Sequence, residues 1–143
     1  MRFLQLIALL ALTLAWSNCK KADAKGDVSF AKSTFESLAR GDASTEKNID
    51  WQTFNSLGIN VGAQYITLKT EEDKLQFRNG FITQFSSSFR ESGGSVESFS
   101  NWRVTSHNDT HTEVVADSAG GLLMLTVSER DSKERLSAIK IMK

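Results

Sequence analysis

The residues of this chain that could do chemistry are few and widely spaced. Cys19 is the only cysteine, so the chain cannot form an internal disulfide and has no thiol cluster for zinc. His107 and His111 are the only histidines, and with Asp109 and Glu113 they could hold a metal across a hairpin. A solvated hairpin tip explains the same pattern, because a tip gives little desolvation. We therefore expect no metal site and no cofactor.

An enzyme would need acid or base groups that converge in a pocket, and the candidates are Asp50, Tyr65 and Glu113. The serines at 86–88 lack the glycine elbow of a serine hydrolase, and no glycine-rich phosphate loop follows a predicted strand. No nucleophile has an evident activating partner. We expect no catalytic residues and no enzymatic activity, with an exported enzyme as an alternative.

The composition is that of one ordinary globular domain. The chain has 143 residues, of which 40% are hydrophobic and 24% charged. Its 17 basic residues balance 17 acidic ones, so the positive field of a nucleic-acid-binding protein is missing. We expect no nucleic-acid partner.

The N-terminus has the pattern of an export signal. Residues 3–16 are predominantly apolar. Arg2 precedes this run, and Ser17-Asn18-Cys19 follows it. The run is shorter than the roughly 20 residues of a membrane span and suits the hydrophobic region of a secretory signal.

Small residues, then Cys19, then a polar segment resemble the lipobox of bacterial lipoprotein precursors. Trp16 and Asn18 depart from the usual Leu and Gly or Ala, and the pattern is similar to the relaxed form of spirochaete lipoproteins. The resemblance implies a lipoprotein signal peptide at 1–18, lipidation (a palmitate-type modification) at Cys19, and a flexible tether over 19–26. It places the protein in the cell envelope, anchored in the membrane, most simply the outer membrane, with its domain periplasmic or surface-exposed. An ordinary signal peptide cut near Ser17, or an uncleaved anchor, remains the alternative.

Three helices are expected before residue 95. The first begins at Asp27 and stops at Arg40-Gly41-Asp42, and a short second helix lies within 45–58, with Ile49, Trp51, Phe54 and Leu57 on one face. Thr70 and the acidic residues after it begin a long helix over 70–91, whose apolar face is aromatic. Within it, we expect Gly80 to allow close packing against a strand.

After Gly94 the apolar period changes to two. Four β-rich runs are separated by short turns, which enforce antiparallel pairing. We therefore expect a single α+β domain at 27–143, in which N-terminal helices pack in a curved, cone-like antiparallel sheet of four or more strands that curls round the long helix.

Residues 30–42, "FAKSTFESLARGD", resemble the opening helix of nuclear transport factor two-like proteins, also called SnoaL-like. The strands "NWRV", "TEVVAD", "LLMLTV" and "LSAIKI" are similar to the sheet of that family. The resemblance implies a cone-shaped α+β fold with a cavity at its mouth. Enzymes of this family often use Asp and His inside the cavity, whereas both histidines here lie at one predicted hairpin tip.

Residues 56–85 resemble, more narrowly, a segment of periplasmic phospholipid carriers of the Mla pathway. In those carriers a Thr-capped helix directs Phe residues into a lipid cavity. This chain lacks the extra N-terminal helices of the carriers, which leaves the size of any cavity open.

The aromatic residues are the remaining candidates for a ligand site. They could wall an apolar pocket or simply fill the core: Trp51, Tyr65, Phe77, Phe81, Phe85 and Trp102. We expect a lipid-anchored envelope protein that binds a small apolar molecule or a protein partner, with a periplasmic lipid carrier as an alternative.

Overall fold

The computed structural model describes residues 24–143, with side chains from residue 26 onward. The predicted signal peptide and Cys19 lie outside the described residues. The first helix, α1, spans Ala24–Arg40, so it begins three residues before the predicted start at Asp27 and takes in the last part of the predicted tether. Ala and Lys favour helix, and Asp27 lies in the first turn, where its charge suits the helix dipole.

The end of α1 agrees with the sequence prediction. Gly41 has a positive φ of 77°, its N–H donates to the Leu38 carbonyl, and the N–H of Asp42 donates to the Ser37 carbonyl. This pair of hydrogen bonds is a Schellman motif, which caps the last carbonyl groups of a helix. Asp42 then accepts a hydrogen bond from the Ser44 N–H and begins the 3₁₀ helix η1, Ala43–Asn48.

The predicted second helix within 45–58 is wrong. After η1 the chain turns and forms two very short strands, β1 (Asn55–Ser56) and β2 (Ile59–Asn60), followed by a short helix α2, Val61–Tyr65. The cause is pairing with a distant strand, because Ile49 bridges Leu136 and the Asp50 N–H donates to the Leu136 carbonyl. Such tertiary pairing overrides a local helical period.

The long helix α3 spans Glu71–Glu91 and begins at Thr70, whose hydroxyl accepts a hydrogen bond from the Asp73 N–H. The prediction of this helix and of its cap is confirmed. The expected close approach of Gly80 to a strand is wrong, since no atom outside the local helix lies within 4 Å of the position that a Cβ would take there.

Replacing Gly80 with alanine is therefore expected to raise the free energy of unfolding by about 1 kcal/mol. The new methyl group meets open space, while the unfolded chain loses conformational freedom. Urea denaturation followed by circular dichroism measures the change. Gly80→Val is the control, because a β-branched side chain at the same position has a lower helix propensity than alanine. A loss of stability in the alanine variant would contradict the open environment.

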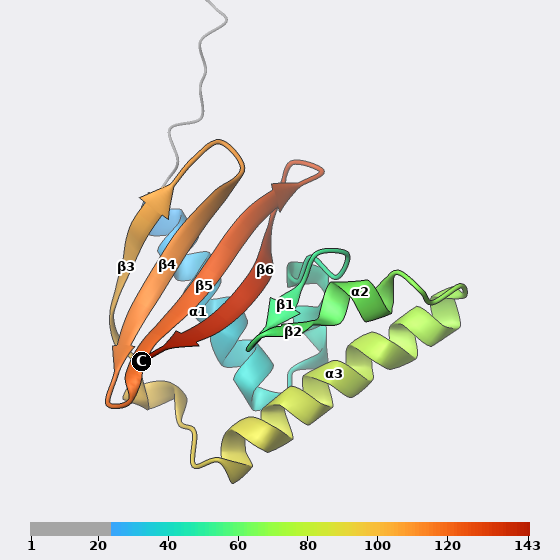
Figure 1. Cartoon of the computed structure of the whole chain (residues 1–143), viewed down its shortest axis with the longest axis horizontal. Coiled ribbons are helices and arrows are strands. Elements are labelled where there is room, and N and C mark those ends of the chain that lie inside the picture. The colour runs from blue at the N-terminus through green and yellow to red at the C-terminus, as the bar shows by residue number, and fades with distance from the viewer. Residues whose placement is uncertain (1–23) are drawn as a thin grey trace, which may run out of the picture.

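A six-stranded sheet forms the other half of the domain (Figure 1). Its main part is an antiparallel meander of β3 (Ser100–His107), β4 (His111–Ser118), β5 (Gly121–Arg130) and β6 (Lys133–Met142). The strand β1 adds to β6 in parallel and β2 completes the order β2-β1-β6-β5-β4-β3. The α+β class and the four predicted strands are confirmed. A one-turn 3₁₀ helix η2, Val96–Ser98, leads into β3.

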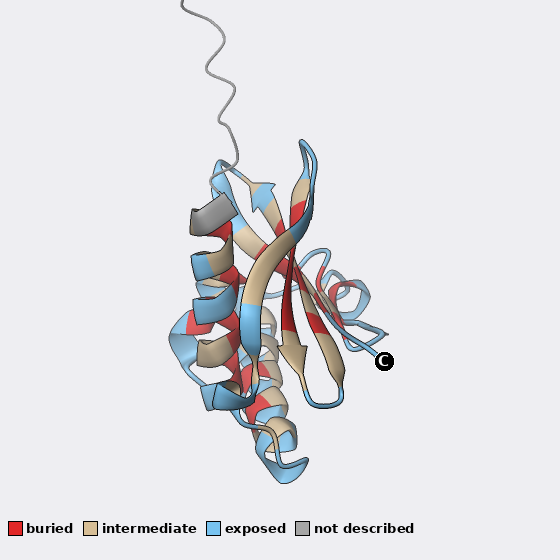
Figure 2. Ribbon diagram, turned by 90° about the vertical axis from the view of Figure 1, so that its left-hand side faces the viewer, coloured by how far each residue is buried: buried red, intermediate tan, exposed pale blue. Residues whose placement is uncertain are grey.

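The helix that lies on the sheet is α1 and not the long helix. The buried side of α1 faces the strands (Figure 2), and α1 contacts all four strands of the meander, whereas the main contacts of α3 are with α1 and η1. The expectation that the sheet curls round the long helix is therefore corrected. The reason is the apolar stripe of α1, whose small and medium side chains Ala31, Leu38 and Ala39 are fully buried and permit close packing.

The core lies between α1 and the inner face of the sheet. On neighbouring strands the buried residues are directly opposite one another, as Val114 is opposite Leu125 and Leu125 opposite Ile139. Because side chains alternate across a strand, this register commits one face to the core.

Candidate apolar binding groove

A chain of aromatic rings connects α1 to α3. Phe35 of α1 is almost fully buried, and its ring makes edge-to-face contacts with Phe85, Phe89 and Phe99 at centroid distances of 6.4, 5.9 and 5.3 Å. Aromatic rings prefer this geometry because the positive edge of one meets the negative face of the other. These contacts set the distance between the C-terminal half of α3 and the rest of the domain.

A groove lies beside these rings, between α3 and the sheet, with a volume of about 410 Å³. Volumes of roughly 300–1,000 Å³ are typical of small-molecule sites. The lining side chains come from α1, α3, the segment before β3, the strands β5 and β6, and the β1–β2 turn: Phe35, Leu57, Phe85, Ser88, Phe89, Ser92, Phe99, Leu123, Ile139 and Ile141.

The lining is apolar apart from Ser88 of α3 and Ser92, the residue that follows α3, and none of the lining residues is charged. The Ser92 hydroxyl donates to the Phe89 carbonyl of α3, and the Ser88 hydroxyl accepts a hydrogen bond from the Gln84 side chain. Both serines are exposed. The groove therefore offers a mainly hydrocarbon surface, and its only polar lining side chains are solvent-exposed serines.

Two large apolar side chains at this groove are unusually exposed. Leu57 is 54% exposed and Ile141 is 47% exposed, and both line the groove. The Leu57 N–H donates to the Ile139 carbonyl. Leu57 is therefore hydrogen-bonded to β6, the strand that also contains Ile141. Exposed apolar surface that continues into a concave apolar site is a feature of ligand grooves.

Of the six aromatic residues predicted to wall a pocket, only Phe85 lines this groove. Four of the others pack around one another at the opposite half of α3, with the Trp51 ring 5.9 Å from Tyr65, 6.4 Å from Phe77 and 5.7 Å from Phe81. Trp102 packs against Phe35 and Phe99. The groove is centred nearer the C-terminal end of α3 than the predicted set, because helical spacing does not say which turn meets the core.

The candidate acid and base residues are not among the lining residues of this groove. Asp50 is 4% exposed, and the Arg130 guanidinium donates to both of its carboxylate oxygens at 2.9 and 3.0 Å. The Tyr65 hydroxyl accepts a hydrogen bond from Arg78. Glu113 lies between the inward-facing Thr112 and Val114 and so belongs to the outer face of the sheet. Asp50 and Tyr65 are therefore each held by a different arginine, and Glu113 lies on the outer face of the sheet.

Arg78 is a structural cation. Its side chain donates to the Glu46 carboxylate at 2.8 Å and to the Tyr65 hydroxyl at 2.9 Å. Burial alone would lower the pKa of Arg78, but the hydrogen bonds to Glu46 and Tyr65 outweigh that effect and raise it. Arg78 therefore stays charged and ties α3 to η1.

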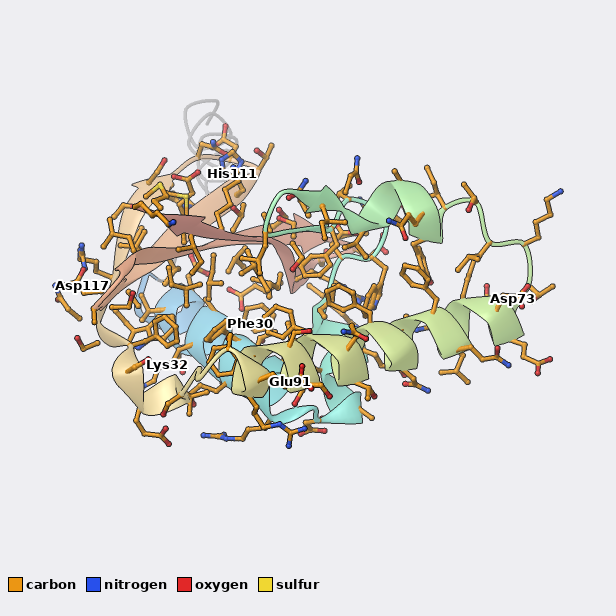
Figure 3. The ribbon with its side chains drawn as sticks, turned by 60° about the horizontal axis from the view of Figure 1, so that its bottom comes forward. Phe30, Lys32, Asp73, Glu91, His111 and Asp117 are labelled. Atoms are coloured by element: carbon orange, nitrogen blue, oxygen red, sulfur yellow. The ribbon has the colours of Figure 1, made fainter. Side chains whose placement is uncertain are left out.

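The two histidines lie at the β3–β4 hairpin, and Figure 3 shows His111 at the end of the sheet away from α3. The His107 Nδ1 atom is 2.7 Å from the Thr112 hydroxyl, which donates in turn to the Asp27 carboxylate at 3.0 Å. The His111 ring lies near the Asn108 and Thr110 side chains of the turn. Within the described residues, no group of three or more His, Cys, Asp or Glu side chains is placed to hold a metal ion.

Sequence reasoning missed Leu57 and Phe99 as parts of the groove. The helical spacing of the apolar residues within 45–58 predicts Leu57 on a helix face, and no local pattern singles out Phe99. The Leu57-Gly58 pair offers a weak signal, since a glycine at the second place of a two-residue turn indicates a hairpin.

No helix among residues 24–143 is long and apolar enough to cross a membrane.

Comparison of this chain with known proteins found no matching family model, no significantly similar curated protein and no significantly similar solved structure.

Proposed function

We propose that this protein is an exported lipoprotein, anchored to the membrane through Cys19, whose α+β domain binds a hydrocarbon chain in the groove between α3 and the sheet. The observation that carries the binding proposal is the groove itself: about 410 Å³, with eight apolar lining side chains, two serines and no charged group. Such a lining favours an apolar molecule, because a charged one would lose its hydration without gaining a partner.

The volume and the lining set the scale of affinity. Burial of about ten methylene groups is worth roughly 8 kcal/mol before the cost of immobilising the chain is subtracted. The net affinity is then expected to be micromolar or weaker. This is the range of a binder that exchanges its ligand rather than holding it permanently.

The N-terminal pattern supports the anchor. Ala24, the first residue of α1, comes five residues after Cys19, and five extended residues span at most about 17 Å. A domain held by such a tether stays close to the membrane, which is a source of hydrocarbon chains. Anchoring favours a fixed receptor over a diffusing lipid carrier, although both would bind the same chemical group.

The two family resemblances support the same site. A curved sheet with a helix packed inside it agrees with the cone-like arrangement expected of nuclear transport factor two-like proteins. Phe85 belongs to the segment that resembles the phospholipid carriers and lines the groove, whereas Phe77 and Phe81 of the same segment pack around Trp51.

The test is binding of a dansyl-labelled fatty acid, followed by its fluorescence, to the purified domain and to Ser88→Trp. Ser88 is an exposed lining residue, so a tryptophan there fills the groove without replacing any core side chain. We expect affinity to fall by at least about tenfold, because the indole occupies the site of the chain.

The matched control is Thr83→Trp, which adds the same side chain to an exposed position of α3 that is not among the lining residues. It should bind like the natural protein. Equal affinity of the natural protein and both variants would place the fatty acid outside the groove, and absence of binding to the natural protein would contradict the proposal directly.

A further inference from the structure

The β1–β2 turn contains a residue whose type does not suit its backbone. Leu57 and Gly58 are the two central residues of the hairpin, with Ser56 paired to Ile59 on either side of them. Their φ angles are +53° and +86°, and a type I′ turn requires positive φ at both places. Asn-Gly is the preferred pair there, whereas a leucine in the left-handed region is strained.

The other positive-φ positions of the described chain make the contrast clear. Apart from glycines they hold Asn101, Asp131 and Ser132, which are short polar residues. Asp131 and Ser132 form the equivalent two-residue turn between β5 and β6. Leu57 is thus the only apolar residue that has positive φ within residues 24–143.

Besides its backbone strain, Leu57 has a second unfavourable feature: more than half of the surface of this apolar residue is exposed to water. Both costs would vanish with asparagine at this place. What a leucine adds is an apolar side chain at the groove, where it lies among the lining residues. Its backbone is also held in place, because the Leu57 N–H donates to the Ile139 carbonyl of β6. Strain of this kind concentrates at ligand sites.

We propose that Leu57 is the ligand-retaining residue of the groove: its side chain lies over a bound hydrocarbon chain at the mouth and slows its release. This inference rests on the proposed function and adds a residue that determines residence time. The strained turn is in place before the ligand arrives, so binding does not have to order it. The exposed surface of Leu57 becomes covered when the groove is filled.

The experiment compares Leu57→Asn with the natural protein by stopped-flow release of the dansyl-labelled fatty acid into excess unlabelled fatty acid. Asparagine suits the turn, so thermal stability should be unchanged or higher. The release rate should rise about fivefold, because apolar contact at the mouth is lost while association is little affected. Leu57→Met, which keeps an apolar side chain, should release the probe at nearly the natural rate.

The matched control is Ile66→Asn, which removes an apolar side chain that is 63% exposed and is not among the lining residues. It should leave the release rate unchanged. If the natural protein binds the probe, Ser88→Trp blocks it, and Leu57→Asn releases it at the natural rate, the retaining role is overturned while the groove stands. If the natural protein does not bind the probe, both proposals fail.

Discussion

Substitution of Phe35 with alanine is expected to lower the free energy of unfolding by about 4 kcal/mol. Phe35 is 2% exposed and makes ring contacts with Phe85, Phe89 and Phe99. The substitution removes a whole buried ring and leaves a cavity that joins the groove. Because native domains are stable by only about 5–15 kcal/mol, this change would remove a large fraction of the stability of the domain.

Urea denaturation monitored by tryptophan fluorescence and by circular dichroism measures this effect. Phe30→Ala is the matched control, since Phe30 belongs to the same helix but is only partly buried at the edge of the core. Phe30→Ala should lower the free energy of unfolding by less than half as much as Phe35→Ala does. Equal losses for the two variants would mean that the aromatic chain around Phe35 does not hold α3 in place.

Substitution of Cys19 with serine is expected to abolish fatty-acid labelling of the protein and its partitioning into detergent. A lipid-modified cysteine carries acyl chains, and each buried CH₂ contributes about 0.8 kcal/mol to membrane binding. A serine cannot form the thioether on which this modification is built. Metabolic labelling with palmitate in a bacterial host, followed by detergent-phase separation, measures both effects.

The control for the anchor is Asn18→Ala, which keeps the thiol and supplies the small residue that usually precedes it in a lipobox. Labelling should persist or increase in this variant. An ordinary signal peptide or an uncleaved apolar anchor predicts a different result. In either case Cys19→Ser would behave like the natural protein.

The two experiments address separate parts of the proposal. Loss of the anchor in Cys19→Ser leaves the fold and the groove untouched, because Cys19 precedes the first helix of the domain. Loss of binding in Ser88→Trp leaves the anchor untouched. A protein that binds fatty acid but is not labelled at Cys19 would be a binder without a lipid anchor, and the reverse result would identify a lipid-anchored domain with another partner.

Elements that depend on neighbouring residues could be predicted from the sequence. Thr70 and the acidic residues after it begin α3, and Gly41 ends α1 because glycine accepts the left-handed conformation of the cap. The alternation of apolar residues after Gly94, interrupted by short turns, determines an antiparallel meander. Each of these signals acts within a few residues, so no tertiary information is needed.

The segment from Ile49 to Leu57 could not be predicted in this way. Its apolar residues recur at helical spacing, yet Ile49 and Asp50 pair with Leu136 of β6. Asp50 is further held by Arg130, 80 residues away in the chain. Contacts between residues so distant in sequence outweigh a weak local preference, and they leave no local trace.

The sequence by itself determined the class of the fold, the long capped helix and the four strands of the meander. It also predicts Cys19 as the attachment point of a lipid anchor. The tertiary structure decided which helix lies on the sheet, that Trp51 and Phe81 belong to the core, and that Phe89 and Leu57 meet at one groove. The physical reason is that capping, turn chemistry and periodicity act locally. A groove depends instead on which surfaces remain uncovered after the whole chain has packed.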